Sequence, residues 1–358
     1  MKVLFVYKLL TMGGVETVLR ARLEGLPKYG VDAQAWFLFD GPGRVIFEDV
    51  TSQVHVGSTG LLREFLLREN FDLLSTIDTE EILPTVRRLR EQPLLVIEAH
   101  TPYTENLEYL RFLGDTPIAA FFVPSEHQAH LVRKFVGQDA GIRVIPNSLA
   151  GIFEAEIDEF LPKPPHPVVA WIGRLDDLKN WQEFIQIAKL VREGRQRVEF
   201  WIVGKSGGED ISRDLYQRAR RAKILNCMRW YRGLPYVKMP ILLDAVRSSG
   251  GMVVSTSKGD SFGMTVAEAM ARACSVLVPS QGPFGEFVEV GVHGEMYPLG
   301  NVKEAAKKIA VLLEDGELRS QMGIRGREHI LRRYASASSA RGYANELRSL
   351  FHQKTPPN

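Results

Sequence analysis

The chain has 358 residues, of which 45% are hydrophobic, and this is enough apolar material for two domains of ordinary size. Its 45 basic and 43 acidic residues leave a formal net charge of +2, which argues against a dedicated nucleic-acid-binding protein. The two cysteines, Cys227 and Cys274, are far apart and lack metal-ligand spacing. We therefore expect buried packing cysteines in a reducing compartment, and no metal site.

The N-terminal run MKVLFVYKLL is interrupted by Lys8 and lacks a small-residue cleavage site, which predicts a first strand rather than a signal peptide. No apolar run approaches the roughly 20 residues that span a bilayer. We therefore expect a cytoplasmic protein. The segment LLREFLLREN, with adjacent Leu and Arg faces, adds peripheral contact with the inner membrane face as a minor hypothesis.

Apolar runs alternate with helical patterns through the first half of the chain. A strand at Val3–Tyr7 is followed by Gly13 and Gly14 and then by apolar residues at helical spacing. The glycines do not form GxGxxG, so a tight turn is favoured and a nicotinamide site is weakly supported. The other strands predicted here are Ala33–Phe39, Val54–Val56, Leu73–Thr76, Leu94–Glu98, Ala119–Val123 and Val144–Ile145. This alternation implies a parallel, doubly wound sheet.

Besides His55, the histidines of this half occur at two places. His100 follows the strand predicted at 94–98, where the carboxyl end of a parallel strand opens toward a ligand. A structural role is an equally good interpretation of a lone histidine. His127 and His130 lie in a helix that Ser125 is placed to cap, and they have no clear acidic partners for a metal.

A proline-rich segment, Glu156–Pro167, has four prolines from Pro162 onward and predicts a linker. We place an N-terminal domain at 1–163, a C-terminal domain at 164–335, and a final helix at 336–358 that packs back on the first domain and ends in a frayed tail. The strands predicted in the second half are 168–173, 198–204, 228–231, 250–257 and 275–278. Helices are expected from Trp181, at 211–222 and 239–247, from Thr265, at 302–314, and from 318 to about 351. The pattern predicts two Rossmann-like domains that face each other across a cleft.

Cations and carboxylates follow the strands of the second half. Arg174 and Lys179 can clamp a diphosphate, although an ordinary surface loop is the better explanation when they are taken alone. Asp260 and Glu268 flank the start of a helix, which Asp260 or Ser261 can cap. Free N–H groups at such a start favour an anion. Together these groups suit the phosphates and vicinal hydroxyls of a sugar nucleotide.

Four segments also carry recognisable motifs. GRLDDLKN at 173–180 is similar to GRL-x-x-x-KG, and KGDSFGMTVAEAMARACSVLV at 258–278 is similar to EGFG-x-x-x-x-EAMA-x-G-x-PVV. GGVE at 13–16 resembles a first-loop signature, and IPNSLA at 145–150 resembles a PNG segment. In this combination the chain resembles the retaining GT-B glycosyltransferases of group 1, which include relatives of glycogen synthases and bacterial mannosyltransferases. Chance similarity would require several spaced motifs to coincide.

The resemblance implies a role for each matched residue. Arg174 and Lys179 would bind the diphosphate of the donor, Glu268 the ribose hydroxyls and Asp260 the transferred sugar, with His100 beside that sugar. Backbone groups that would meet the sugar or the phosphates belong to Gly13, Gly14, Phe262, Gly263, Met264 and Thr265.

The reaction that the resemblance implies is hexosyl transfer with retention, without a metal or a cofactor. The donor would be a nucleoside-diphosphate sugar, and the acceptor a glycan, a lipid-linked saccharide or a small molecule. A nucleotide-sugar epimerase of similar architecture and a non-catalytic glycosyltransferase-like partner protein are the alternatives. A nicotinamide enzyme is the weakest of the rivals.

The chain departs from the family pattern at four places. Asp260 replaces a glutamate and is one methylene shorter, which bears on the identity of the sugar. Asn180, Ala273 and Ser148 stand where glycine is usual. None of these changes removes a charge from the proposed donor site.

Overall fold

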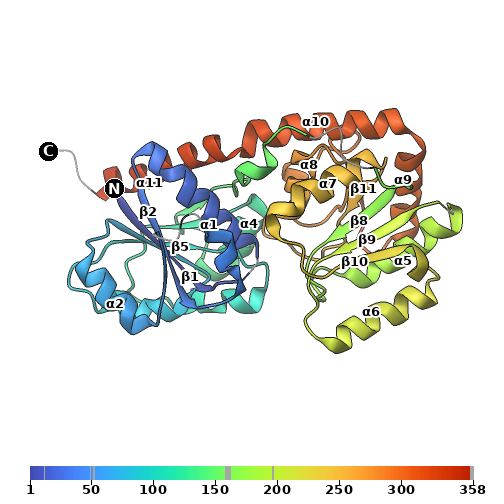
Figure 1. Cartoon of the computed structure of the whole chain (residues 1–358). Helices are drawn as coiled ribbons and strands as arrows, with labels where there is room; N and C mark the ends of the chain where they lie inside the picture. Colours follow the sequence, from blue (N-terminus) through green and yellow to red (C-terminus); the bar gives the residue numbers. More distant parts are fainter. Residues whose placement is uncertain (12, 49, 51–52, 158–162, 196, 355–358) are drawn as a thin grey trace. The chain divides into compact units, whose positions relative to one another are not determined.

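A computed structural model of the protein describes residues 1–11, 13–48, 50, 53–157, 163–195 and 197–354 (Figure 1). The chain divides into two compact units, one formed by Met1–Gly151 with Tyr334–Asn358 and the other by Ile152–Arg333. Each unit has its own parallel sheet with helices packed against it. The predicted α/β class with two Rossmann-like domains is confirmed.

The first unit is built on a seven-stranded parallel sheet in the order β3-β2-β1-β4-β5-β6-β7. Its strands are β1 (Lys2–Leu9), β2 (Asp32–Phe39), β3 (Val54–Val56), β4 (Leu73–Ile77), β5 (Leu94–Glu98), β6 (Ala120–Val123) and β7 (Ile142–Val144). Each lies at or near its predicted place, although β7 begins and ends earlier than the predicted 144–145. Apolar runs identify these strands because a parallel strand is buried on both faces.

Alternate residues of β1 belong to two separate cores. Val3 and Phe5 pack with α1 and α11 on one face of the sheet, and Leu4 and Val6 pack with α2, α3 and α4 on the other (Figure 1). The helices are α1 (Gly14–Gly25), α2 (Thr59–Arg68), α3 (Leu83–Arg87), α4 (Glu126–Val136) and α11 (Ser336–Lys354). Ser125 caps α4 as predicted, since its hydroxyl accepts a hydrogen bond from the Gln128 amide.

The second unit has a six-stranded parallel sheet in the order β10-β9-β8-β11-β12-β13. Its strands are β8 (Val168–Ile172), β9 (Glu199–Val203), β10 (Met228–Tyr231), β11 (Met252–Val254), β12 (Val276–Pro279) and β13 (Glu295–Tyr297). Its helices are α5 (Trp181–Gly194), α6 (Glu209–Arg221), α7 (Met239–Ser248), α8 (Met264–Ala271), α9 (Val302–Glu314) and α10 (Gly316–Tyr334). The sequence analysis did not predict β13. Side chains of α5, α6 and α9 share one core with the sheet, whereas α7 packs on β8 and β11, and α8 on β12.

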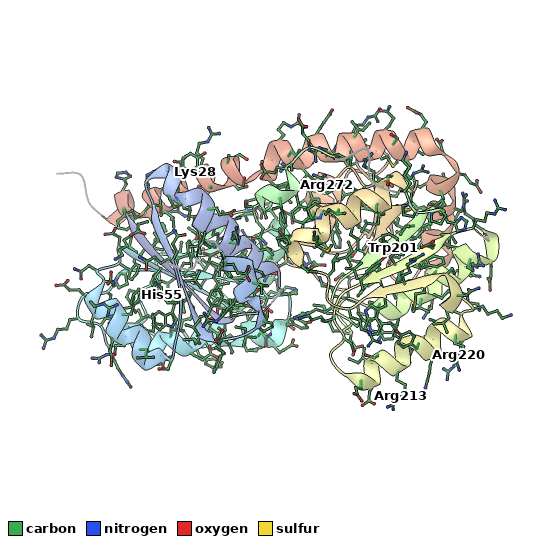
Figure 2. The ribbon with its side chains drawn as sticks, viewed as in Figure 1. Lys28, His55, Trp201, Arg213, Arg220 and Arg272 are labelled. Carbon is green, nitrogen blue, oxygen red and sulfur yellow. The ribbon has the colours of Figure 1, made fainter. Side chains whose placement is uncertain are left out.

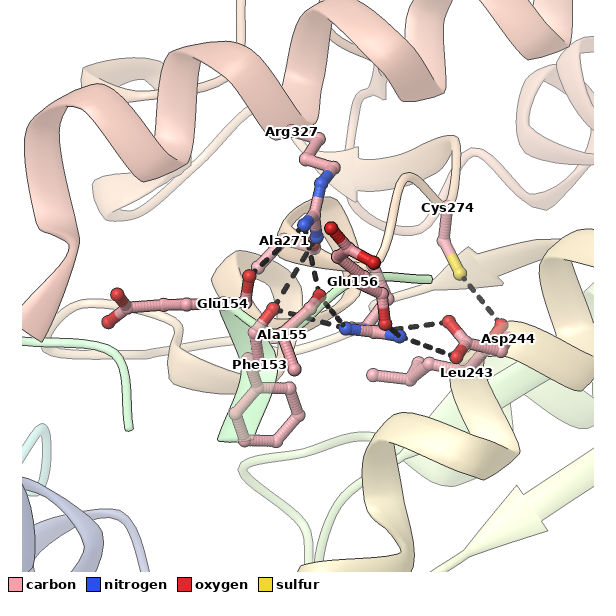
Figure 3. Close-up of polar contacts among 10 residues, drawn as sticks. Phe153, Glu154, Ala155, Glu156, Leu243, Asp244, Ala271, Cys274 and Arg327 are labelled. Carbon is pink, nitrogen blue, oxygen red and sulfur yellow. Dashed lines mark hydrogen bonds and ion pairs between the residues drawn. The ribbon is translucent and has the colours of Figure 1, made fainter. Parts of the chain in front are cut away.

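Two arginines hold the segment that follows Gly151 on the second unit. Arg272 donates to the carbonyl oxygens of Ala155 (2.6 Å) and Glu156 (3.1 Å), and Arg327 also donates to Ala155 (3.1 Å; Figure 3). The division after Gly151 therefore precedes the prolines at which the sequence analysis places the boundary. Residues 158–162 of the predicted linker lie outside the described residues.

The helical pattern predicted from 318 to about 351 is interrupted just before 336, where the sequence analysis begins its final helix. This region forms two helices, α10 and α11, which are separated at Ala335. Both cysteines are free; Cys274 is fully buried, but Cys227 is only partly buried against the second core, so the expectation of burial is correct for Cys274 alone. Within the described part of the chain, no helix combines the length and the apolar character needed to cross a bilayer.

Candidate active site

The loops that follow β8 and β11 meet at the carboxyl edge of the second sheet. The Lys258 amide donates to the Leu178 carbonyl oxygen (2.8 Å), and the Thr256 hydroxyl lies 3.0 Å from the Lys179 carbonyl oxygen. The Ser257 hydroxyl donates to the Gly259 carbonyl oxygen (2.8 Å), which closes the second loop on itself. These bonds fix the two motif-bearing loops against each other, as expected for the carboxyl ends of neighbouring parallel strands.

An ion pair joins the two loops. Nζ of Lys179 lies 2.6 Å from Oδ1 of Asp260, and the two side chains are only 20% and 14% exposed. The Lys179 amide also donates to Oδ1 of Asp176 (2.8 Å), which anchors the backbone of the loop. The structure therefore brings together two residues that the sequence analysis proposed separately.

Arg174 lies on the same loop as Lys179 but extends toward solvent. Its side chain is 66% exposed, and its Nε lies 3.2 Å from Oδ2 of Asp176. An exposed pair of this kind contributes little to stability because solvent screens it. Breaking this pair with Asp176 would consequently cost little.

Helix α8 begins beside this ion pair, and its first residues are arranged by glycine and phenylalanine. Gly263 is the N-cap, with φ of 96°, and a Cβ at this position would lie 2.7 Å from a ring carbon of Phe284. Phe262 is buried and stacks on Phe287, with ring centroids 5.5 Å apart. The capping role expected of Asp260 or Ser261 is therefore wrong, because the chain takes a left-handed turn at Gly263 after them. Since glycine has no side chain to cap the helix, the first N–H groups of α8 are suited to an anionic ligand.

Glu268 lies one turn into α8 and is 4% exposed. Burial raises the pKa of its carboxyl to about 7, while a hydrogen bond from the Tyr236 hydroxyl (2.8 Å) acts in the opposite direction. The Tyr236 ring in turn meets the ring of Phe153, with centroids 5.5 Å apart. A buried carboxylate with one donor retains acceptor sites for the hydroxyl groups of a ligand.

The first unit holds His100 in a buried network centred on Glu98. His100 is 6% exposed, and its Nε2 lies 2.9 Å from Oε2 of Glu98. The Glu98 carboxylate also accepts two hydrogen bonds of 2.9 Å from Arg22 and one each from Ser75 (2.5 Å) and Tyr343 (2.6 Å). Although burial acts to raise it, the pKa of Glu98 lies well below its usual value because Arg22 and His100 stabilise the charged form. These contacts account for a structural role of His100, and its contact with a sugar stays a prediction.

The two glycines of the first loop precede and begin α1. Gly13 is the N-cap and Gly14 the first helical residue. Glu16 is buried, and its carboxylate accepts hydrogen bonds of 2.5 Å from both the amide and the hydroxyl of Thr11. A Cβ at Gly13 would lie 2.9 Å from Oε2 of Glu16, so the turn is tight, as the sequence analysis favoured.

Comparison with known proteins identifies the family to which the segment with these loops belongs. Residues 153–329 match the family described as glycosyl transferases group 1. These residues form a group 1 glycosyltransferase domain. The match contains Arg174, Lys179, Asp260 and Glu268, so the predicted family resemblance is confirmed.

Known proteins also align with nearly the whole length of this chain. A trehalose synthase of Pyrococcus horikoshii is 24% identical over 375 residues, which cover 94% of this chain and 87% of that protein. The solved structure of Anabaena HepE in complex with UDP and glucose has a TM-score of 0.81 at 21% identity and covers 98% of this chain and 100% of that one. Sucrose-phosphate synthase from Thermosynechococcus elongatus has a TM-score of 0.81 at 14% identity, covering 99% of this chain and 100% of that one. The predicted GT-B fold is confirmed.

Sequence reasoning missed one polar partner in the candidate site. Tyr236 follows β10 in the segment RGLPY, and nothing in that segment indicates a contact with α8, which lies 32 positions further along the chain. Only the order of the strands in the sheet could have suggested it. Among the described residues, no group of three or more His, Cys, Asp or Glu side chains is arranged to hold a metal ion.

Proposed function

We propose that this glycosyltransferase transfers a hexosyl group from a nucleoside-diphosphate sugar to a saccharide or lipid-linked acceptor, with retention of configuration and without a metal ion. The pairing of Lys179 with Asp260 beside the uncapped start of α8 carries the proposal. A cation, a carboxylate and helix N–H groups are gathered there at one edge of the sheet. UDP-glucose is the first donor to test, because HepE was solved with it.

The diphosphate of the donor is the natural partner for the positive groups. Lys179 supplies a compact charge, Arg174 a forked donor on an adaptable side chain, and α8 its first N–H groups at Met264 and Thr265. When the diphosphate binds, phosphate oxygens replace the Asp260 carboxylate at the Lys179 ammonium group. This exchange frees Asp260 to accept hydrogen bonds from the hydroxyls of the transferred sugar.

The ribose is assigned to Glu268. Its carboxylate has room to accept from two vicinal hydroxyls while Tyr236 holds its orientation through one hydrogen bond. Vicinal hydroxyl donors stabilise the charged form of the carboxylate, so binding lowers the pKa that burial has raised. Nucleotide binding should therefore release a proton near neutral pH.

In the chemical step the bond from the anomeric carbon to the phosphate oxygen breaks as the bond to the acceptor oxygen forms on the same face of the sugar. The departing phosphate oxygen takes the acceptor proton, so no side chain has to act as the base. Lys179, Arg174 and the α8 amides stabilise the charge that develops on the diphosphate, and each such donor contributes about 2.7–4 kcal/mol to lowering a barrier. Asp260 and Glu268 position the substrate in this scheme.

The test combines binding with product analysis. UDP-glucose, GDP-mannose and ADP-glucose are screened for a rise in Tm, since a ligand that binds only the folded protein stabilises it. The preferred donor is then incubated with candidate acceptors in the presence and absence of EDTA. We expect a product with the anomeric configuration of the donor at a rate that EDTA does not change. Conversion of the donor sugar without an acceptor would instead identify an epimerase, and no binding of any donor would favour a non-catalytic partner protein.

A further inference from the structure

Asn180 follows Lys179 directly and has an unusual backbone conformation. It is the N-cap of α5, and its φ of 54° lies in the left-handed region. Asparagine tolerates this region better than most residues do, yet only glycine adopts it freely. Because φ of Asn180 is a torsion between Lys179 and α5, it sets the direction of the chain at Lys179 relative to the helix. A group that fixes this torsion therefore also fixes Lys179.

The carboxylate of Glu183 holds the Asn180 side chain. Nδ2 of Asn180 donates to Oε2 of Glu183 (2.6 Å), and the two residues are only 7% and 8% exposed. Their spacing is that of a capping box, in which each side chain bonds a backbone N–H of the other residue. Here the side chains bond each other, and the Asn180 amide donates to the Asp176 carbonyl oxygen (3.2 Å). Ordinary helix capping consequently does not account for this pair.

The other oxygen of Glu183 binds a more distant part of the second unit. Oε1 accepts hydrogen bonds of 3.0 Å from the Tyr297 hydroxyl and from the Gly300 amide. Tyr297 ends β13 and is fully buried, and Gly300 lies between β13 and α9. The carboxylate thus has donors on both of its oxygens, which determines its orientation. Glu183 thereby fastens the start of α5 to the end of β13.

A second set of buried groups holds the peptide unit between Lys179 and Asn180. The Thr256 hydroxyl lies 3.0 Å from the Lys179 carbonyl oxygen and 2.9 Å from that of Asn180. This hydroxyl in turn accepts a hydrogen bond of 2.9 Å from the indole N–H of Trp171. Thr256 and Trp171 are 0% and 1% exposed. A fully paired polar network of this kind restricts the backbone to one arrangement, so the loss of one anchor affects its neighbours.

We infer that Glu183 is a positioning residue for Lys179, and that it acts by holding Asn180 in the left-handed conformation. The inference rests on the proposed role of Lys179 at the diphosphate of the donor. Glu183 itself does not contact the donor. Without its carboxylate the turn at Asn180 relaxes toward the right-handed region, and the Lys179 ammonium group moves away from the diphosphate. A displacement of about 1 Å at such a group costs up to about 100-fold in rate.

The test uses glycine to make Glu183 dispensable, because glycine adopts a positive φ without support. Glu183→Ala is compared in the wild type and in the Asn180→Gly background. The donor is whichever of UDP-glucose, GDP-mannose and ADP-glucose raises the Tm most, and kcat and KM are measured below the Tm of every variant. Glu183→Ala should lower kcat by about 10–100-fold with little change in KM, because Lys179 acts on charge that develops in the transition state. In the Asn180→Gly background the loss should be less than about threefold.

Glu199→Ala is the matched control for the loss of a buried carboxylate. Glu199 is 7% exposed and begins β9, at the opposite edge of the sheet from Lys179. Its carboxylate accepts hydrogen bonds from Trp201 (3.0 Å; Figure 2) and Arg229 (2.9 Å). The control should lower the Tm, as Glu183→Ala does, but it should leave kcat at the wild-type value.

Two variants of Asn180 keep the test decisive if Glu183→Ala folds poorly. Asn180→Ala and Asn180→Gly both remove the hydrogen bond to Glu183, whose other two donors remain. Only alanine is strained at a φ of 54°. The kcat of Asn180→Ala should therefore be at least about tenfold below that of Asn180→Gly. Equal kcat values in these two variants would contradict the inference.

Hydrogen exchange in the segment 176–183 separates this inference from the proposed function, since it needs no donor. Exchange should be faster in Glu183→Ala than in the wild type and should slow again in the double variant with Asn180→Gly. If Lys179→Ala turned over like the wild type, the proposed function would fail, and exchange would still decide whether Glu183 positions the loop. Unchanged exchange in Glu183→Ala, or an equal loss of kcat in both backgrounds, would overturn the inference.

Discussion

Nζ of Lys179 and Oδ1 of Asp260 lie 2.6 Å apart, although 81 positions separate the two residues in the chain. Both side chains are largely withdrawn from solvent, at 20% and 14% exposed, so each charge depends on the other for its compensation. Such a pair is costly to break by removing one partner. In the proposed mechanism the incoming diphosphate takes over the role of Asp260 at the ammonium group, so this cost does not arise when the donor binds.

Lys179→Ala should reduce kcat by about 10²–10³, because it removes one positioned donor from the departing diphosphate. Asp260→Glu should retain turnover but change the ratio of kcat/KM between two donor sugars, because the carboxylate moves outward by one methylene. Steady-state kinetics with UDP-glucose and a second sugar nucleotide measures both effects. Lys189→Ala on α5 is the control, since that lysine is exposed and pairs with Glu193, and it should leave kcat unchanged. Wild-type kinetics in Lys179→Ala would refute the assignment of the donor site.

The titration of Glu268 should leave a signature in stability against pH. Burial raises its pKa to about 7 in the folded protein, from 4.5. Between these values the folded state binds a proton that the unfolded state releases. The free energy of unfolding is therefore highest below pH of about 4.5, and it falls as the pH rises to about 7. The loss is on the order of 3 kcal/mol.

Glu268→Gln should flatten that slope and should be more stable than the wild type above pH 7, while it weakens nucleotide binding. Denaturant unfolding at several pH values, with hydrogen exchange in β11 and β12 as the local probe, measures the effect. Glu314→Gln, at an exposed position of α9, should keep the wild-type slope. The same slope in Glu268→Gln as in the wild type would show that another group is responsible.

The sequence predicted a structural element correctly where the pattern that indicates it lies within one continuous segment. The long apolar runs identified the inner strands because β1, β4 and β5 are buried on both faces of their sheet. Residues 295–297 form only a short strand at the sheet edge, and just one of the three is buried. That strand produced no periodicity to detect.

Contacts between residues that are far apart in the sequence were the other feature that could not be predicted. The cations and acids of the candidate site were found because each belongs to a motif, whereas Tyr236 has no motif and acts only through its contact with Glu268. The helical pattern from 318 to about 351 did not by itself show the break at Ala335, for a similar reason. No glycine or proline marks it, and the Tyr334 carbonyl oxygen instead accepts a hydrogen bond from the Leu149 amide (2.9 Å). Contacts between distant segments determine such features.

Ala273 should be a point of removable backbone strain. Its φ is 54°, a left-handed conformation that costs a residue with a side chain about 1–2 kcal/mol. Ala273→Gly relieves this strain but gives the unfolded chain more freedom, so we expect a net gain of about 0.5–1 kcal/mol in the free energy of unfolding. Chemical denaturation measures it. The same exchange at Ala310, inside α9, should instead destabilise by about 0.5–1 kcal/mol, and equal effects at both positions would contradict the explanation.

Tyr343 should connect helix α11 energetically to the first sheet. Its hydroxyl donates to Oε1 of Glu98 (2.6 Å), and its ring lies 4.1 Å from the guanidinium carbon of Arg22. Tyr343→Phe keeps the ring but withdraws one donor from a buried carboxylate, so the first unit should lose about 2 kcal/mol. Glu98→Gln leaves Arg22 buried without its counter-charge and should cost about 3–5 kcal/mol.

Tyr29→Phe is the matched control, because the Tyr29 hydroxyl also donates to α11, at the Ala337 carbonyl oxygen (3.0 Å), but this hydrogen bond is exposed to solvent. It should change stability by less than about 0.5 kcal/mol. Hydrogen exchange resolved by strand distinguishes the two cases in a protein of two units. The Tyr343 and Glu98 variants should speed exchange in β4, β5 and β6 while β8 and β9 keep their protection. Faster exchange in β8 and β9 alone would mean that the buried network does not stabilise the first sheet, and α11 would then depend on its apolar contacts.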